Sequence, residues 1–203
     1  MYRLYDFLPS GNGYKVRLLL NQLQIPYTRI EIDILAKKTR SPEFLAKNPN
    51  GRIPVLEIAP DRFLAESNAI LFYLSQGTEY FPQNAIERSL VMQWLFFEQY
   101  SHEPNIATSR YWITILGEEE KYREPLQQKR KLGDEALNVL NQHLMSRSFL
   151  VGERYTIADI GLYAYTHVAG EGGFDLSQFQ ALESWLKRIE SQPRYIKIGD
   201  RPN

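Results

Sequence analysis

Residues 52–74 read RIPVLEIAPDRFLAESNAILFYL, and this stretch decides the fold. Two short apolar runs, Val55–Ile58 and Phe63–Leu64, are separated by the turn-forming sequence APDR, which is typical of a hairpin. Ser67 then precedes apolar residues that are spaced for one face of a helix, so it is predicted to cap that helix. The stretch therefore predicts two antiparallel strands followed by a helix.

The residues before this stretch predict a strand–helix–strand unit. Tyr2–Phe7 is short and aromatic, and Tyr27–Ile34 alternates apolar and polar residues, so both are predicted as strands. Between them, Val16–Leu23 carries apolar residues at the i, i+3, i+4 and i+7 positions of a helix. Ser41-Pro42-Glu43 marks the start of a further helix. A βαβ unit followed by a ββα unit predicts a small mixed sheet with helices packed on it.

The second half of the chain has a different pattern, in which strand signals nearly vanish. Its clearest helix places apolar residues four apart, with a further leucine beside them: Leu132, Ala136, Leu140, Leu144 and Leu137. We therefore predict an α/β domain over residues 1–77, a linker over 78–84 and an all-helical domain over 85–203.

The composition excludes several classes of function. The chain has 24 basic and 24 acidic residues, so it lacks the basic surplus of a nucleic-acid-binding protein. It has no cysteine, which excludes disulfides, a protein thiol nucleophile and a cysteine-based zinc site, and its three histidines lack metal-site spacing. No run of residues is apolar enough to span a membrane, and Met1–Asp6 does not resemble a secretory signal. We expect a cytoplasmic protein without metal or cofactor.

Ser10 lies in the turn between the first predicted strand and helix, with Asn12 two residues later. Backbone amides and the positive end of a helix meet in such a turn, and both favour an anion. A thiol placed there would be more acidic than a free thiol, whose pKa is about 8.5. The alternative is that Ser10 or Asn12 only caps the helix.

Three further motifs follow. In Arg52-Ile53-Pro54 a proline enters a strand, and because only about 5–6% of X–Pro bonds are cis, local sequence predicts a trans bond. Glu66-Ser67 is either a helix start or a site for an amino-acid head group, with amides and the hydroxyl for its carboxylate and Glu66 for its ammonium. Thr156-Ile157-Ala158-Asp159 is a capping-box variant, which serves folding.

In this order, the four motifs resemble the cytosolic glutathione transferase family, in its bacterial serine/asparagine type without a catalytic cysteine. The resemblance implies a thioredoxin-like N-terminal domain, an all-helical C-terminal domain and a cis bond before Pro54. It also implies that Glu66 and Ser67 hold the γ-glutamyl group. Ser10 matches the serine that contacts the glutathione sulfur, and Asn12 resembles an asparagine of relatives with disulfide-reductase activity. The residues thereby implied to bind glutathione around the strand-entering proline are Arg52, Ile53 and Pro54.

The family's second substrate, an electrophile, binds between the domains. Candidates by position are Tyr14, His102, Arg110, Tyr111 and Trp112. His102 is similar to an active-site histidine of bacterial relatives, although its spacing from Trp94 differs by one residue, and a lone helical histidine is more often only partly buried. Tyr5 falls within the first strand and is discounted.

The resemblance implies a homodimeric transferase of detoxification, in which the thiolate of glutathione attacks a small hydrophobic electrophile. Two alternatives stay open. One is glutathione-dependent disulfide reduction, in which both reacting thiols come from glutathione. The other is a protein that binds glutathione or a hydrophobic ligand with negligible turnover. No nucleic-acid or membrane partner is expected.

Overall fold

The computed structural model describes residues 1–201, which form two compact units. The N-terminal unit comprises Met1–Gln76 and the chain from Pro193 onward. The helical unit comprises Gly77–Gln192. The structure thus joins the C-terminal tail to the N-terminal unit, whereas the division by sequence had assigned it to the helices.

The N-terminal unit contains a four-stranded mixed sheet of order β2-β1-β3-β4. In chain order its elements are β1 (Tyr2–Asp6), α1 (Gly11–Gln22), β2 (Tyr27–Glu31), the 3₁₀ turn η1 (Lys38–Arg40), α2 (Pro42–Leu45), β3 (Val55–Ala59), β4 (Arg62–Ala65) and α3 (Ser67–Ser75). β1 pairs parallel with β2 and antiparallel with β3, and β3 and β4 form the hairpin. This is a thioredoxin-like arrangement, and the predicted βαβ and ββα order is confirmed.

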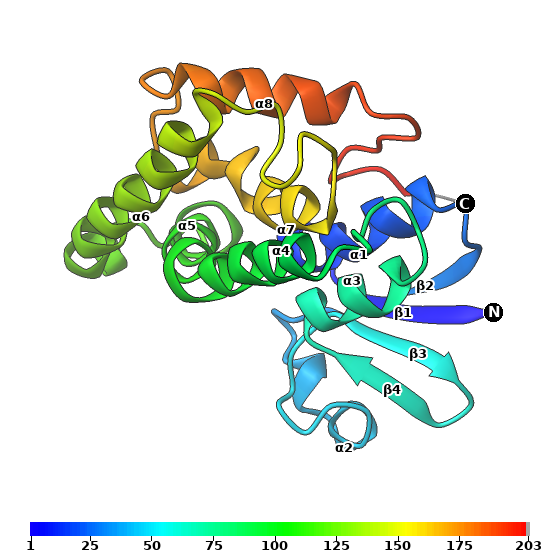
Figure 1. The fold of residues 1–203 in the computed structure, drawn as a ribbon. Helices are drawn as coiled ribbons and strands as arrows, with labels where there is room; N and C mark the ends of the chain where they lie inside the picture. Colours follow the sequence, from blue (N-terminus) through cyan, green and yellow to red (C-terminus); the bar gives the residue numbers. More distant parts are fainter. Residues whose placement is uncertain (202–203) are drawn as a thin grey trace. The chain divides into compact units, whose positions relative to one another are not determined.

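The two faces of the sheet bury different residues. Tyr5 pairs with Val55 across β1 and β3, and both pack with Phe44 of α2. The neighbouring pair, Leu4 and Leu56, is also fully buried, and because side chains alternate along a strand it points to the opposite face. In Figure 1, α1 and α3 lie together on one side of the sheet and α2 lies away from them. The sheet is therefore covered on both faces.

Two local predictions in this unit differ from the structure. The strand predicted over Tyr27–Ile34 ends at Glu31. The reason is a turn that follows, in which the Asp33 carboxylate accepts hydrogen bonds from the amides of Leu35 and Ala36, both at 2.9 Å. Ser67 is the first residue of α3 rather than its cap.

Side chains of α1 hold the C-terminal tail. The Tyr14 hydroxyl donates to the carbonyl of Ile196 at 2.6 Å, and Arg17 donates to the carbonyl of Ile198 at 2.8 Å. Tyr14 and Arg17 are three residues apart and share one face of the helix. These bonds explain why the tail belongs to the N-terminal unit.

The helical unit begins with an irregular segment over residues 77–84, and its first helix follows. Its elements are α4 (Ala85–Phe97), the π-helical turn η2 (Glu98–His102), α5 (Glu103–Arg110), the π-helical turn η3 (Tyr111–Ile115), η4 (Glu120–Tyr122), α6 (Arg123–Leu144), α7 (Ile157–Thr166), η5 (Ala169–Gly172) and α8 (Gln180–Glu190). Within residues 77–192 the only β pairing is an isolated bridge between Val151 and Arg154. α6 packs against α5 and α8 (Figure 1).

The predicted apolar face of α6 is largely confirmed. Its buried members are Ala136, Leu137, Leu140 and Leu144. Leu132, predicted on the same ridge, is instead 37% exposed and lines a groove described below.

The capping box at the start of α7 is also confirmed. The Thr156 hydroxyl accepts from the amide of Ala158 at 3.3 Å, and the Asp159 carboxylate accepts from the amide of Thr156 at 2.9 Å. The other oxygen of Asp159 accepts from the Leu150 amide at 3.0 Å and from the Trp185 indole at 2.9 Å. Burial raises the pKa of Asp159 to about 6, against the lowering effect of these hydrogen bonds. Asp159 thus joins α7, α8 and the preceding loop.

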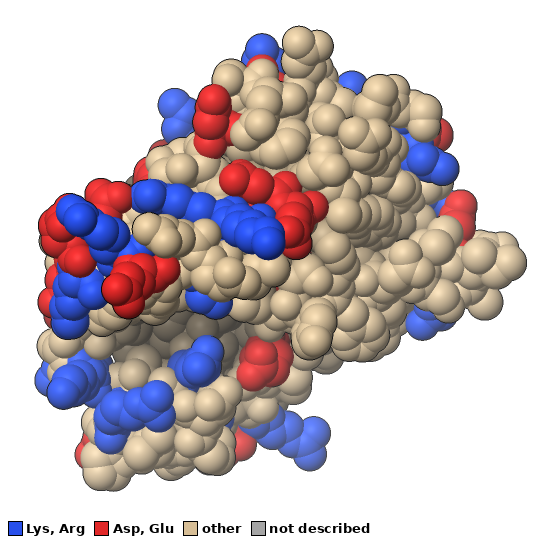
Figure 2. Space-filling model, turned by 90° about the vertical axis from the view of Figure 1, so that its left-hand side faces the viewer, with Lys and Arg blue, Asp and Glu red and all other residues tan. Residues whose placement is uncertain are grey.

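Charges of both signs are mixed on the surface. On the face drawn in Figure 2, acidic and basic side chains lie next to one another. Before α6, Lys121 pairs with Glu118 and Arg123 pairs with Glu120, at 2.8 and 2.6 Å. In the part of the chain that the structure describes, no helix combines the length and the apolar character that a membrane span needs.

Candidate functional site

Ser10 occupies the N-cap of α1, where the sequence placed either a cap or a thiol site. Its backbone is extended, and its hydroxyl oxygen accepts from the amide of Gly13 at 3.2 Å. The hydroxyl of Ser10 is therefore a cap in this structure. Because the oxygen acts as an acceptor here, its hydrogen can still be donated to a ligand at the positive end of the helix.

The start of α1 is set by a buried carboxylate beneath it. Asp6 ends β1, is fully buried and forms an ion pair with Arg17 at 2.9 Å. Burial raises the pKa of Asp6 to about 6, while Arg17 and Arg29 act in the opposite direction. A Cβ atom on Gly13 would lie 1.6 Å from this carboxylate, so only glycine fits there. Gly13 thereby lets the first turn of α1 sit directly on the end of β1.

The loop before β3 contains a cis bond between Ile53 and Pro54. The family resemblance implied this bond, and the trans bond expected from local sequence is wrong. Asn48 donates its side-chain amide to the carbonyl of Arg52 at 2.8 Å, which fixes the loop just before the proline. Pro54 is buried and Ile53 is half-buried, whereas Arg52 is exposed. The backbone of Ile53 is thus held at the entrance to the strand.

Glu66 has a φ of 66°, in the left-handed region that residues other than glycine rarely adopt. It precedes α3, makes no side-chain cap, and its side chain is exposed. This turn is why the helix starts at Ser67, whose side chain is buried. Non-glycine residues in this region cluster at functional sites, where surrounding structure holds them.

Hydrogen bonds join the starts of α1 and α3. The Ser67 hydroxyl donates to the side-chain oxygen of Asn12 at 3.2 Å. The ammonium of Lys15, which is fully buried, donates to the Ser67 hydroxyl at 3.2 Å and to the side-chain oxygen of Asn68 at 3.4 Å. Two predicted site residues, Asn12 and Ser67, are therefore in direct contact although 55 positions separate them.

Sequence analysis missed Lys15 and Asn68. One signal for Lys15 was available, because it precedes Leu19 by four residues and so lies on the same side of the helix as an apolar position. Asn68 offered no comparable signal, since asparagine in a first helical turn is common.

The candidates for a second substrate are of two kinds. Tyr14 of the N-terminal unit and His102 of the helical unit are fully buried. The Tyr14 hydroxyl is bonded to the tail, and the Nε2 atom of His102 lies 2.9 Å from the Thr166 hydroxyl. The side chains of Tyr14 and His102 thus bind structural partners within their own units.

The other three candidates lie around η3 in the helical unit. Arg110 is buried and pairs through Nε with Glu171 at 2.7 Å. Trp112 stacks on Tyr122, with ring centres 4.3 Å apart and planes within 4°. Tyr111 and Trp112 are both half-buried, so part of each side chain is open to solvent. Within residues 1–201, no three His, Cys, Asp or Glu side chains gather as metal ligands would.

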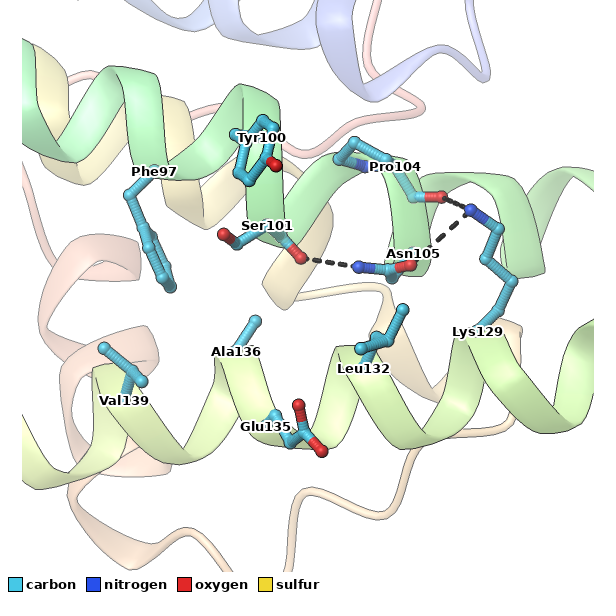
Figure 3. A pocket seen from close by; sticks show the side chains of 10 residues that line it. All are labelled: Phe97, Tyr100, Ser101, Pro104, Asn105, Lys129, Leu132, Glu135, Ala136 and Val139. Carbon is cyan, nitrogen blue, oxygen red and sulfur yellow. Dashed lines mark hydrogen bonds between the residues drawn. The ribbon is translucent and has the colours of Figure 1, made fainter.

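A groove of about 540 Å³ lies in the helical unit between the α4–α5 segment and α6 (Figure 3). Its apolar walls include Phe97, Leu132 and Val139. At one end, Lys129 donates to the carbonyl of Pro104 at 2.8 Å. Figure 3 shows Leu132, Ala136 and Val139 of α6 directed toward the opposite segment.

In a comparison with known protein families, two parts of the chain each match a domain of one family. Residues 1–76 match the N-terminal domain of glutathione S-transferase, and residues 94–193 match its C-terminal domain. A solved glutathione S-transferase of Pseudomonas fluorescens Pf-5 is 48% identical, with a TM-score of 0.96, and the alignment covers 98% of this chain and 99% of that one.

Two further relatives carry specific functional descriptions. The disulfide-bond oxidoreductase YfcG of Escherichia coli K12 is 31% identical, over 95% of this chain and 92% of its own. A glutathione transferase family member from Pseudomonas fluorescens Pf-5, solved with two glutathione molecules bound, is 28% identical. Its TM-score is 0.82, with coverage of 95% of this chain and 89% of that one.

Proposed function

Because this chain belongs to the glutathione S-transferase family, we propose that it binds glutathione at the starts of α1 and α3 and transfers it to a hydrophobic electrophile. The observation that carries the proposal is the contact between these two helix starts. Ser10 and Asn12 lie at one, Glu66 and Ser67 at the other, and the Ser67–Asn12 hydrogen bond joins them.

Each part of glutathione has a matching group in the N-terminal unit. The backbone of Ile53, at the start of β3, pairs with the cysteinyl residue in the manner of a strand, with Pro54 and Arg52 on either side. The backbone amides at the start of α3, that of Ser67 among them, hold the γ-glutamyl carboxylate, and Glu66 pairs with its ammonium.

The thiol then lies at the start of α1, where the positive helix end and the hydrogen of the Ser10 hydroxyl favour the thiolate over the thiol. The thiol proton is released to water. The sulfur lone pair forms a bond to the electrophilic carbon. With an aryl halide, the halide departs with its bonding pair; with an enone, the π pair moves to the carbonyl oxygen and the enolate takes a proton from water. Stabilising the thiolate and holding it beside the electrophile are the contributions of the protein. For contact with the electrophile, Tyr111 and Trp112 are the preferred candidates, while Tyr14, His102 and Arg110 are assigned to the scaffold.

Disulfide reduction is the second candidate function. It is favoured by Asn12, whose amide lies beside Ser67, and by the 31% identity to a disulfide-bond oxidoreductase. A panel of aryl halides, enones and small disulfides, assayed with glutathione, separates the candidates. Conjugation of the carbon electrophiles supports transfer, consumption of disulfides alone supports reduction, and binding without turnover supports a ligand-binding protein.

Replacing Ser10 by glycine is expected to slow turnover while leaving the fold nearly unchanged. Glycine caps a helix almost as well as serine, within a few tenths of a kcal/mol. Glycine cannot donate to the sulfur, so the pKa of the bound thiol should rise. The activation free energy of turnover should rise by about 1.5–3 kcal/mol, the value of a hydrogen bond to a charged group. The measurement is kcat against pH, together with the melting temperature.

Ser10→Thr, which keeps the hydroxyl, is the matched control and should retain most of the turnover. If the kinetics of Ser10→Gly match those of the wild type across the pH range, the hydroxyl has no such role. The assignment then passes to Asn12, for which Asn12→Ala is the corresponding variant.

We also propose that the chain forms a homodimer that buries the exposed apolar and aromatic side chains of the α4–η2 segment. Ile86, Phe96 and Tyr100 on the α4–η2 segment are 72%, 67% and 87% exposed, which is unusual for large apolar and aromatic side chains. Light scattering at micromolar concentration should give about twice the chain mass of 23.7 kDa. Phe96→Glu should shift the protein toward the monomer, whereas Met145→Glu, at an exposed site at the end of α6, should not. A wild-type monomer contradicts the proposal.

A further inference from the structure

Lys15 is a buried cation whose hydrogen bonds to Ser67 and Asn68 lead to the proposed glutathione site. It lies on α1, is fully buried, and donates to Ser67 and Asn68, the first two residues of α3. Arg17, the other fully buried cation of this helix, instead binds Asp6 and the C-terminal tail. Lys15 and Arg17 are two residues apart, so they lie on opposite sides of α1 and face different partners.

The chemistry of an ammonium gives this contact a direction. Lys15 has three N–H donors and no acceptor, so the Ser67 oxygen must act as the acceptor. The Ser67 hydroxyl hydrogen then points away from the cation, and it is donated to the side-chain oxygen of Asn12. If Asn12 turned its NH₂ group toward Ser67 instead, the partly positive hydrogens of that group would lie near the Lys15 ammonium, which is unfavourable.

The last link of the chain is the side chain of Asn12. Its amide has an oxygen at one end and an NH₂ group at the other. When the oxygen accepts from Ser67, the NH₂ group lies on the opposite side of the amide. Lys15 and Asn12 are thus joined through Ser67, at the start of the helix that carries Ser10.

We propose that Lys15 is a positioning residue for glutathione chemistry: through Ser67 it orients the Asn12 amide so that its NH₂ group donates to the glutathione sulfur. This inference rests on the proposed function, because it requires glutathione at the starts of α1 and α3. Lys15 itself touches neither the sulfur nor the electrophile. It also couples the γ-glutamyl site, at Ser67, to the thiol site, at Asn12.

The test replaces Lys15 by methionine, which has similar length and no donor, and measures the pKa of the thiol of bound glutathione from the ultraviolet absorbance of the thiolate. In the Lys15→Met variant this pKa should rise by about one unit, which corresponds to a tenfold smaller equilibrium constant for ionisation. In an Asn12→Ala background, Lys15→Met should cause no further rise, because the group that it orients is gone. Turnover should fall in parallel, with a smaller change in KM.

Arg17→Met is the matched control for a purely structural effect. It removes an equally buried cation from the same helix, so it should lower the melting temperature. Because Arg17 pairs with Asp6 below the start of α1, any change that it causes in the thiol pKa should be the same with and without Asn12→Ala. Where Lys15→Met folds poorly, Lys15→Gln replaces it, since glutamine removes the charge and can turn an acceptor toward Ser67. A wild-type thiol pKa in the Lys15 variants, or additive effects with Asn12→Ala, overturns the inference and leaves the proposed function standing. If the wild type does not bind glutathione, both fail together.

Discussion

Replacing Asp159 by alanine is expected to destabilise the helical unit by about 3–9 kcal/mol, because each of three buried donors left without an acceptor costs about 1–3 kcal/mol. The carboxylate accepts from the amides of Leu150 and Thr156 and from the indole of Trp185, and all of these bonds are buried. Alanine removes the acceptor for every one of them. Since whole domains are stable by only about 5–15 kcal/mol, most of the variant should be unfolded or aggregated on expression. Denaturant unfolding followed by circular dichroism is the measurement.

Two variants bracket this result. Glu79→Ala removes an exposed carboxylate of the same unit and should unfold like the wild type. Asp159→Asn keeps an acceptor but places an NH₂ group against donors, so it should fall between the wild type and Asp159→Ala. The fraction of Asp159→Asn that folds should turn over glutathione at a near-normal rate per active site, because this residue belongs to the scaffold. A folded Asp159→Ala protein of wild-type stability contradicts the account of this unit.

The double variant Glu66→Ala, Ser67→Ala is expected to lose glutathione affinity by a factor of about 10 or more, because a removed hydrogen bond to a charged group is worth about 1.5–3 kcal/mol. Glu66 would lose its pairing with the γ-glutamyl ammonium, and Ser67 the hydroxyl that joins the buried Lys15 to Asn12 at the same helix start. Calorimetric titration with glutathione measures the loss. The melting temperature is recorded alongside, because Ser67 also accepts from the buried Lys15.

The matched control removes the same two side-chain types from the first turns of α4. Glu87→Ala, Ser89→Ala lies in the helical unit and should keep wild-type affinity for glutathione. Wild-type affinity in a folded Glu66→Ala, Ser67→Ala protein would remove the γ-glutamyl group from the start of α3.

The features that the sequence predicted correctly are those whose partners are close in the chain. Thr156 and Asp159 are three residues apart, and their reciprocal bonds follow from that spacing alone. The failures depend on conformation or on distant contacts. The left-handed backbone of Glu66 moved the start of α3, and Leu132 fits the apolar period of α6 but lines the groove and stays 37% exposed.

The candidate site divides along the same line. Ser10 was found from its turn, and the Glu66-Ser67 pair from its place before a helix. The Lys15–Ser67–Asn12 chain was not predicted, because it joins residues 52 and 55 positions apart and depends on how α1 packs on α3. The cis bond before Pro54 came from family resemblance, since local sequence favours the trans form.

The measurement that tests the central claim most directly is the titration of the wild-type protein with glutathione, followed by calorimetry and by thiolate absorbance. The account predicts saturable binding of glutathione to each chain and a bound thiol with a pKa below the free value of about 8.5. Folded protein that shows no saturable binding at millimolar glutathione, or that binds it with an unshifted thiol pKa, would contradict the account.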